Sequence, residues 1–410
     1  MTTFDRLSLA QWRQFSNVEI DLSANTTVLT GVNGCGKTTI LNILSQHFGW
    51  NLSLIATPFL SKRKRKKIWS DLSRYYFDNE DPEQFENQAE IGSISYSNGE
   101  TCRLLKPNNA SNAAKYNLRY ENRQNVNGLH IPSHRPAMNY QQVEQIPTNP
   151  KTKQQHYQDF QNLLLNTYHS ENVRNPIKIL KESLISLALF GYGNQAVVQN
   201  PEFRDLYETF QDILAALLPD ELGFERLEIR MPDIVLITKT GEFALDAMSG
   251  GINAIFGIAW QIHMASQSDT DTTVVIDEPE NHLHPSMQRK LLPGISEAFP
   301  RHHFVIATHS PFIVTSNPEA YVYGLIHGNQ NTITAEKLSA SDLAASPNKI
   351  LRDILDVPTT IPIWAEKKIS QILSRYENDE VDPKKIDRMY KELKEQGLTD
   401  ALTGYFPDQE

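Results

Sequence analysis

The sequence predicts an α/β protein in which loops at the ends of parallel strands carry the chemistry. Residues 28–30 form an apolar strand that leads into a glycine-rich loop and then into a helix. Two later apolar runs, residues 272–276 and 304–308, are each followed by acidic or imidazole side chains. Apolar strands that alternate with helical stretches are typical of a parallel or mixed sheet covered by helices.

Composition limits the number of domains, the kinds of binding site and the cellular location that we expect for this protein. Its 410 residues allow a large core and one to three domains, and its formal net charge of -10 makes any nucleic-acid site a local one. Because Cys35 and Cys102 are the only cysteines, neither a disulfide framework nor a cysteine-rich zinc site is available. The sequence shows neither a secretory leader nor an apolar run of about 20 residues, so we expect a soluble, cytoplasmic protein with no membrane partner.

The pattern along the first part of the chain predicts strands around one helical stretch. Apolar and polar residues alternate over residues 7–15 and 17–22, which predicts a meander ahead of the glycine loop. From about Leu52 to Arg74 the pattern is helical and includes six consecutive cations. Residues 89–105 alternate around a Ser-Asn-Gly turn and predict a hairpin, and residues 106–124 predict a loop.

The rest of the chain is richer in helical patterns. A short apolar strand at 128–132 is followed by a polar, proline-punctuated segment that ends at Pro150. Residues 151–222 mix helical periodicity with helix breakers. The apolar sets that carry this periodicity are Ile177, Leu180, Leu184 and Leu187, then Phe210, Ile213, Leu214, Leu217 and Leu218. Two further helices are predicted near the C-terminus, at residues 364–378 and 383–396.

The loop after the first apolar strand has the form of a phosphate cradle. Its small residues let consecutive backbone N–H groups turn inward onto phosphates, and the next helix directs its positive N-terminal end at the same anion. Lys37 would reach the outer phosphates, and the hydroxyl of Thr38 would hold Mg²⁺. The predicted nucleotide-binding residues of this loop are Gly31, Val32, Asn33, Gly34, Cys35, Gly36, Lys37, Thr38 and Thr39.

Two adjacent acids follow the apolar strand at 272–276. Asp277 stands at the end of the strand, where it is suited to hold the water shell of a metal ion, and Glu278 is placed to polarise a water that attacks the terminal phosphate. An apolar run that ends in Asp-Glu is weak evidence by itself, because acids commonly flank strands. The order of the other motifs strengthens it.

Two further motifs flank the acid pair. Ser249, Gly250 and Gly251 precede an apolar helical stretch, so they offer a hydroxyl and bare backbone amides to a second anion. His309 follows the next predicted parallel strand and would stand beside a terminal phosphate. Taken singly, a Ser-Gly-Gly is more often a helix cap and a His-Ser-Pro more often a turn, but chance rarely produces all these motifs in this order.

Together these residues resemble the ABC-type ATPase head of the SMC-like and RecF-like branch, over roughly residues 4–50 and 226–328. The resemblance implies ATP and Mg²⁺ as cofactors. It makes Ser249, Gly250 and Gly251 the signature motif, residues 280–285 the D-loop, Glu278 the catalytic glutamate and His309 the switch histidine, with Lys37 also catalytic. It further implies a homodimer or higher oligomer, in which each ATP lies between the P-loop of one head and the signature of another.

The resemblance also implies an organisation of the chain. The ATPase head would comprise residues 1–50 with the P-loop and residues 226–335 with the remaining motifs. An insertion at 51–225 would hold a basic helix, a hairpin and a helical lid, and a helical tail at 336–410 would bind a partner. The implied fold is a P-loop core on a mixed and parallel sheet, with antiparallel N-terminal strands, a large mainly helical insertion and a short helical tail.

The sequence departs from the family pattern in three places. Cys35 stands where serine is common, and the signature continues as Ile252-Asn253 where an acidic or amide residue is common. The Q-loop has no clear position, and Gln141 and Gln142 are its candidates. The chain also lacks heptads for coiled-coil arms and, after His309, an Asp-x-Asp cluster for a Toprim nuclease, so chemistry beyond ATP would need another subunit.

A narrower resemblance is to the compact ATPases of bacterial anti-phage systems, the PtuA subunits of Septu and of retron-associated modules. It implies that a separate HNH-type nuclease, PtuB in Septu, is the effector that this ATPase controls. Two alternatives stay open: a RecF-like ATPase of DNA repair and recombination, and an ATP-gated scaffold with little turnover. Retron nucleic acid, DNA or RNA is a further candidate partner.

Two local features allow more than one interpretation. The basic run comprises Lys62, Arg63, Lys64, Arg65, Lys66 and Lys67. It would bind the phosphates of DNA or RNA, or it is a solvated face, which is the more common role of such a run. The histidines with close spacing are His282, His284, His302, His303 and His309. Zinc is the weaker interpretation of these, because D-loop and switch roles account for three of them and no cysteine lies nearby in the sequence.

Overall fold

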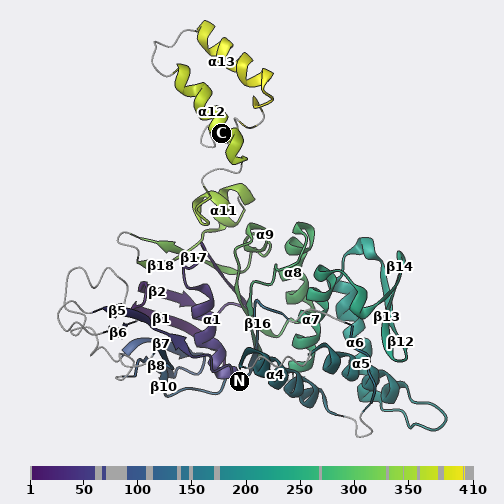
Figure 1. Cartoon of the computed structure of the whole chain (residues 1–410). Coiled ribbons are helices and arrows are strands. Elements are labelled where there is room, and N and C mark those ends of the chain that lie inside the picture. Colours follow the sequence, from purple (N-terminus) through teal and green to yellow (C-terminus); the bar gives the residue numbers. More distant parts are fainter. Residues whose placement is uncertain are drawn as a thin grey trace. The chain divides into compact units, whose positions relative to one another are not determined.

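The computed structural model describes residues 2–60, 67–70, 90–107, 114–135, 140–146, 151–169, 176–266, 270–328, 332–344, 346–357, 361–376, 383–399 and 401. The chain divides into two compact units, Met1–Ala344 and Ala345–Glu410. In Figure 1 the first unit has strands β1, β2 and β7 at its left and helices α5 and α6 with strands β12–β14 at its right.

An 11-stranded mixed sheet organises the first unit, in the order β10-β8-β7-β1-β2-β18-β17-β3-β16-β15-β11. Its strands in chain order are β1 (Phe4–Trp12), β2 (Phe15–Asp21), β3 (Thr26–Thr30), β7 (Glu90–Tyr96), β8 (Thr101–Leu105), β10 (Arg119–Glu121), β11 (Gly128–Ile131), β15 (Thr272–Asp277), β16 (His302–Ala307), β17 (Tyr321–His327) and β18 (Ile333–Lys337). This topology confirms the predicted α/β class with a mixed sheet.

The strands that carry the predicted motifs lie side by side and run parallel. β3 pairs with β16, β16 with β15, and β15 with β11, all in parallel register. Every residue of β3 and β15 is buried, which explains why both read as continuous runs of apolar and threonine residues. Because the strands are parallel, their carboxyl ends meet at one edge of the sheet, where α1 (Lys37–Ser45) begins.

The predicted N-terminal meander and hairpin are confirmed. β1 pairs antiparallel with β2, and the register places Leu7 opposite Ile20 on the buried face. β7 pairs antiparallel with β8 through a turn that includes Gly99 at φ +83°, a conformation that favours glycine. β7 also pairs with β1, so this hairpin belongs to the main sheet.

Two predictions for residues 52–124 are wrong where the structure describes them. The pattern from Leu52 to Arg74 predicts a helix, but the described part forms β4 (Leu54–Ile55), β5 (Thr57–Leu60) and β6 (Lys67–Ser70). The predicted loop contains β9 (Lys115–Tyr116) and β10. These strands have two to four residues and exist through pairing with other segments, such as β4 with β9 and β10 with β8, which a local pattern does not report. Five cations of the basic run, residues 62–66, lie outside the described residues.

Helices and a small sheet complete the first unit. The helices are α4 (Lys153–His169), α5 (Ile177–Tyr192), α6 (Pro201–Leu217), α7 (Gly250–Ala265), α8 (Pro285–Ala298), α9 (Pro311–Val314) and α10 (Ala340–Leu343), with short 3₁₀ turns η1 (Gln46–Phe48), η3 (Asp220–Leu222) and η4 (Leu245–Ala247). The predicted apolar sets lie in α5 and α6, with Leu218 directly after α6, and are buried. Strands β12 (Phe224–Arg230), β13 (Asp233–Thr238) and β14 (Gly241–Ala244) form a separate antiparallel sheet.

The second unit contains α11 (Pro347–Asp353), α12 (Ile363–Tyr376) and α13 (Pro383–Glu395). Its core residues are Ala365, Ile369, Ile372, Leu393 and Leu398. Arg375 of α12 donates to Glu392 of α13 at 2.6 Å, which adds an ion pair beside this core. The two predicted C-terminal helices are thus present within one or two residues of their expected bounds. In neither unit does a described helix have the length and apolar character needed to cross a membrane.

Candidate functional site

The loop between β3 and α1 is a tight turn built on glycines. Gly31, Gly34 and Gly36 have φ of +142°, +84° and +93°. A Cβ atom on Gly36 would lie 2.4 Å from the ring of Phe15, and one on Gly31 would lie 2.5 Å from the carbonyl oxygen of Leu325. Phe15 of β2 and Leu325 of β17 thus leave no room for a side chain at Gly36 and Gly31. Together with the positive φ angles, this explains why glycine stands at both positions.

Lys37 places its ammonium inside this loop. Its Nζ donates to the carbonyl oxygens of Gly31 at 2.7 Å and Val32 at 3.1 Å, and the side chain is largely buried. Cys35 is fully buried next to it, and burial raises the pKa of its thiol. The loop therefore presents one fixed positive charge and a neutral thiol to an anion bound at the N-terminus of α1.

Thr38 and Asp277 meet across 239 residues of sequence. The Thr38 hydroxyl donates to Oδ2 of Asp277 at 3.0 Å, and Asp277 is 3 % exposed. Burial raises the pKa of this carboxyl from 3.8 to about 6, and the hydrogen bond from Thr38 offsets only part of the effect. Its Oδ1 has no hydrogen-bond partner among the described residues. A hydroxyl beside a carboxylate that has a second oxygen without a hydrogen-bond partner among the described residues fits the oxygen ligands that Mg²⁺ prefers.

Glu278 adopts a backbone conformation that is rare outside glycine, with φ +46°. Its N–H donates to the carbonyl of Ala307 at 2.8 Å, and its own carbonyl accepts from Nη2 of Arg135 at 2.6 Å. Its carboxylate accepts from Nδ2 of Asn281 at 3.2 Å, and Nδ1 of His309 lies 3.5 Å away. Contacts on every side hold this strained residue in place, which is the condition under which strain persists at a functional site.

Sequence reasoning missed the part that Glu280 plays. Its Oε1 accepts from the Thr308 hydroxyl at 2.6 Å and from the backbone N–H of His309 at 2.9 Å, and Nδ1 of His309 lies 3.3 Å from it. The side chain of Glu280 is 5 % exposed, so a buried carboxylate fixes the turn after β16. The resemblance places Glu280 at the start of the D-loop, but no local pattern in the sequence indicates its contacts with Thr308 and His309.

Arg135 is another residue of the site to which the sequence assigned no role. It follows β11, which is parallel to β15, so it emerges at the same sheet edge as Asp277 and reaches the carbonyl of Glu278. Gln141, a Q-loop candidate, instead uses its backbone to contact Asp246 and Lys181. An arginine a few residues after a short apolar strand is a signal only once the parallel pairing of that strand is known.

Ser249, Gly250 and Gly251 form the N-terminal end of α7. Ser249 is the N-cap residue, its side chain caps none of the helix N–H groups, and both Ser249 and Gly250 are exposed. A Cβ atom on Gly251 would lie 2.9 Å from the carbonyl oxygen of His282, so the helix end packs closely on the segment after Glu278. In the described part of the chain, no hydrogen bond joins Ser249 to the loop at 31–38. The exposed helix end is therefore open to an anion from outside this chain.

The five closely spaced histidines lie in different surroundings. Nε2 of His302 contacts the Ser266 hydroxyl at 2.7 Å, and burial lowers the pKa of His302 to about 4. Nδ1 of His284 contacts Ser286, and Nδ1 of His303 contacts the carbonyl of Ala24 at 3.5 Å. His282 packs on α7, and His309 faces Glu278 and Glu280. Among the residues that the structure describes, no three metal-ligating side chains cluster in a way that could hold a metal ion.

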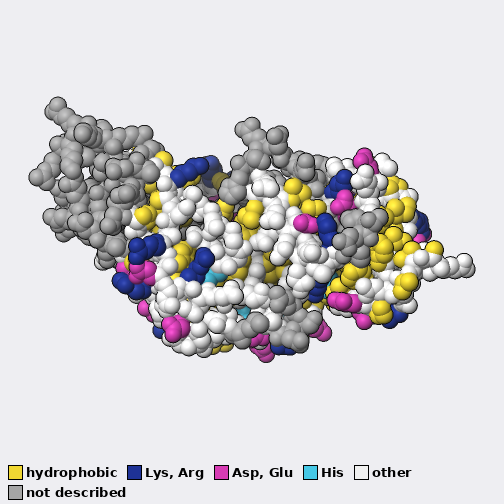
Figure 2. Space-filling view, turned by 90° about the horizontal axis from the view of Figure 1, so that it is seen from below, with side chains coloured by type: hydrophobic (Ala, Val, Ile, Leu, Met, Phe, Trp, Pro, Cys, Tyr) yellow, Lys and Arg dark blue, Asp and Glu magenta, His cyan; other side chains and the backbone are white. Residues whose placement is uncertain are grey.

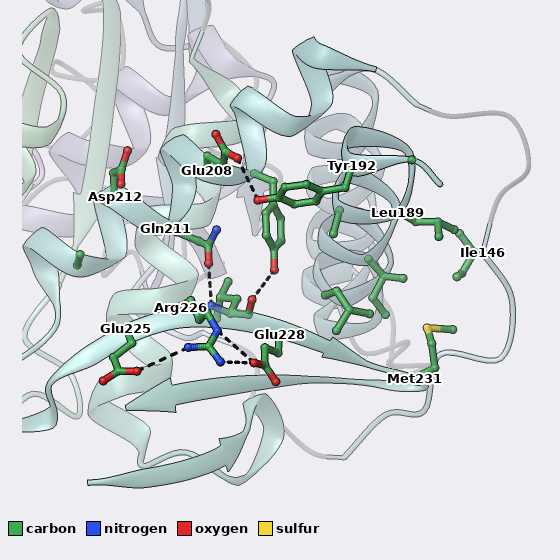
Figure 3. A pocket seen from close by; sticks show the side chains of 17 residues that line it. Ile146, Leu189, Tyr192, Glu208, Gln211, Asp212, Glu225, Arg226, Glu228 and Met231 are labelled. Atoms are coloured by element: carbon green, nitrogen blue, oxygen red, sulfur yellow. Dashed lines mark hydrogen bonds and ion pairs between the residues drawn. The ribbon is translucent and has the colours of Figure 1, made fainter. Parts of the chain in front are cut away.

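A large groove lies outside this site. It has a volume of about 950 Å³ and runs between α5, α6 and β12. In Figure 3, Leu189 and Tyr192 of α5 face it from one side, and Glu208 and Asp212 of α6 lie on another. The Tyr192 hydroxyl donates to Glu208 at 3.0 Å. In Figure 2, hydrophobic side chains gather towards the right-hand end of the view, which is the end where α5, α6 and β12 lie in Figure 1.

The glycine loop with Lys37, the Thr38–Asp277 pair and the Glu278–His309 contact define an ABC/SMC-like P-loop ATPase. Residues 111–315, half of the chain, match the family described as "AAA domain, putative AbiEii toxin, Type IV TA system", and the chain belongs to that family. The matched segment includes the residues from Arg135 to His309, and the P-loop precedes it.

Individual relatives are distant. The chain is 24% identical over 219 residues to "Retron Ec83 probable ATPase" from Escherichia coli. The aligned region covers 51% of this chain and 36% of the relative. It is 20% identical over 416 residues to "Septu protein PtuA" from Bacillus mycoides (strain KBAB4), which covers 98% of this chain and 50% of that protein. The chain thus spans half or less of the length of these relatives. Among solved structures, the SMC head domain from Thermotoga maritima is similar with a TM-score of 0.38 and 13% identity, over 82% of this chain and 99% of that one.

Proposed function

We propose that this chain binds ATP with Mg²⁺ in the loop at residues 31–38 and hydrolyses it. The observation that carries this proposal is the 3.0 Å contact between Thr38 and Asp277, beside a buried carboxylate oxygen for which the described part of the chain offers no hydrogen-bond partner. Thr38 and Asp277 would hold Mg²⁺, which when bound neutralises phosphate charge. Lys37 and the N-terminus of α1 would bind the phosphates themselves.

Glu278 would act on the attacking water. Its carboxylate stands at the sheet edge next to Asp277, and Asn281 and His309 hold it in place. A carboxylate in such a position orients and polarises a water towards the terminal phosphate. His309 faces the same carboxylate with a half-exposed ring, so it would also reach the terminal phosphate.

We infer that two copies complete each site. The exposed Ser249 and Gly250 offer a hydroxyl and a backbone amide at a helix N-terminus, which is a favourable place for a phosphate. A head-to-tail dimer would bring this end of α7 onto the nucleotide that a second copy holds. Binding energy of ATP would then favour the dimer, and hydrolysis would release it.

We further propose that the ATPase controls a separate effector, a nuclease of HNH type, in defence against phage. The support is the similarity to relatives named as parts of Septu and of a retron. Purification of the chain together with the product of its neighbouring reading frame tests this. We expect a nuclease that co-elutes with the ATPase and whose DNA cleavage changes with ATP. A neighbouring replication or repair protein would support a RecF-like role instead.

The Glu278→Gln variant tests the ATPase itself. We expect loss of phosphate release by at least about 100-fold, with binding of fluorescent mant-ATP unchanged and an ATP-dependent dimer that now persists in light scattering. Glu297→Gln makes the same chemical change at an exposed position of α8 and should match the wild type. Wild-type turnover at background would refute hydrolysis and leave an ATP-gated scaffold.

A further inference from the structure

A buried cation lies behind the turn that precedes Ser249. Lys181 of α5 has a fully buried side chain, and its Nζ donates to Oδ1 of Asp233 at 2.7 Å, Oδ2 of Asp246 at 2.6 Å and the carbonyl oxygen of Gln141 at 2.6 Å. An ammonium has three N–H donors, so these three acceptors satisfy it completely. This cluster is outside the residues that would touch ATP.

The three acceptors belong to three separate segments. Gln141 lies on the segment that follows Arg135, Asp233 begins β13, and Asp246 lies in the turn η4. Lys181 therefore joins α5, the small sheet and η4 at one point. Because Asp246 is three residues before Ser249, the ion pair sets where the chain enters α7.

A second contact fixes the same stretch from the other side. Nδ2 of Asn253, in the first turn of α7, donates to the carbonyl oxygen of Met248 at 3.0 Å. The residues between Asp246 and Asn253 thus have one anchor behind them and one ahead of them. Ser249 and Gly250 lie between these anchors and are exposed.

The charge of Lys181 is unusual for its place on the helix. Lys181, Ile185, Ala188 and Tyr192 are spaced as one face of α5, and the last three line the groove between α5, α6 and β12. Burial lowers the pKa of Lys181, but its hydrogen bonds to Asp233 and Asp246 outweigh burial and raise it, so the ammonium stays charged. A buried ion pair usually stabilises a fold no more than apolar side chains of similar volume would. The best-attested role of buried charged groups is to specify one arrangement of the segments that they join.

We propose that Lys181 is a positioning residue for the signature segment: through Asp246 it holds Ser249 and Gly250 in the orientation that meets a nucleotide bound by a second copy. This inference rests on the proposed head-to-tail dimer. Lys181 and Asp246 themselves touch no nucleotide.

Matched asparagine variants separate positioning from stability. Asp246→Asn and Asp233→Asn each remove one carboxylate from the same ammonium, but only Asp246 adjoins the signature. In the full chain carrying Glu278→Gln, we expect Asp246→Asn to weaken ATP-dependent dimerisation at least about tenfold, measured by light scattering. Asp233→Asn should weaken it by less than about threefold. Binding of mant-ATP to the monomer should stay within about twofold of the parent in both variants, because the loop at 31–38 is intact.

Lys181 variants extend the test. Lys181→Met should weaken dimerisation as Asp246→Asn does, and Lys181→Arg should restore part of it because it keeps the charge and its donors. Leu104→Ala is the control for a general loss of stability, because it leaves a cavity at a fully buried position of β8. It should lower the unfolding temperature without weakening dimerisation. Equal effects of Asp246→Asn and Asp233→Asn, or wild-type dimerisation in folded Lys181→Met, would overturn the inference. A parent that binds no mant-ATP or never dimerises would refute the proposed function, and the inference with it.

Discussion

Asp277→Asn separates the stability of the folded chain from its response to Mg²⁺. In the wild type, Thr38 donates a hydrogen bond to Asp277 at 3.0 Å. Asparagine keeps an oxygen that can accept this bond but removes the buried negative charge. We therefore expect a variant that is more stable than the wild type in the absence of nucleotide, and that no longer gains stability from Mg²⁺ with ATP.

The pKa of Asp277 gives the size of the effect. Folding raises this pKa from 3.8 to about 6, roughly two pKa units at 1.36 kcal/mol each, so the buried carboxylate costs about 3 kcal/mol at most. The folded state holds the proton more tightly than the unfolded state. The cost is therefore fully present above pH 6 and disappears as the pH falls towards 4. At pH 5 the stabilisation by Asp277→Asn should be about half its value at pH 8.

Unfolding in urea between pH 5 and pH 8, with and without Mg²⁺ and ATP, measures both parts of this prediction. Asp212→Asn is the matched control, because Asp212 is exposed on α6 and the same change there should stay within about 0.5 kcal/mol at every pH. The wild type should gain stability from Mg²⁺ with ATP, and this gain should shrink below pH 6 as protons compete for Asp277. A variant less stable than the wild type at pH 8, or a difference that does not depend on pH, would refute the reasoning.

Three further substitutions test other parts of the chain. Gly36→Ala places a Cβ 2.4 Å from Phe15 at φ +93°, so mant-ATP affinity should fall at least about tenfold, and unchanged affinity would contradict the tight loop. Asn281→Ala frees the Glu278 carboxylate and should lower kcat about tenfold with mant-ATP binding intact; an equal loss of binding would argue against a role in orientation. Ile369→Ala empties a fully buried position and should lower the stability of the second unit by about 2–5 kcal/mol, seen as faster amide exchange in α12, whereas unchanged exchange would show that this core is not needed there.

The elements that the sequence predicts well are those whose signal is local. β3, the glycine loop and α1 follow one another within 20 residues, and the glycines mark backbone angles that other residues avoid. β15 is recognisable because burial on both faces requires a continuous apolar run. Helices α5 and α6 show their apolar faces at helical spacing.

The elements that the sequence misses depend on distant partners. β4 and β9 are two residues long and pair across about 60 residues, so neither has enough alternation to stand out. The sequence predicts a mainly helical insertion at 51–225 that includes the hairpin β7–β8 and the strand β11, but it does not indicate that these strands and β10 join the main sheet. The role of Glu280 is hidden in the sequence for the same reason. Its partner Thr308 is 28 residues away, and only the register of β15 and β16 brings the two side chains together.

Several features that cost stability lie around the candidate site. Asp277 buries a carboxylate, one oxygen of which has no hydrogen-bond partner within the described ranges, and Glu278 holds a left-handed backbone conformation. Lys181 and Asp246 bury an ion pair where apolar side chains would pack as well. Natural proteins depart from the rules of stable folding mainly where function requires it. Asp277 and Glu278 lie at the sheet edge beside the loop at 31–38, and Asp246 lies three residues before Ser249, as expected if the proposed nucleotide site is made of two surfaces. Asp246→Asn tests the signature surface without touching the P-loop, which is why it distinguishes a two-copy site from a nucleotide pocket within one chain.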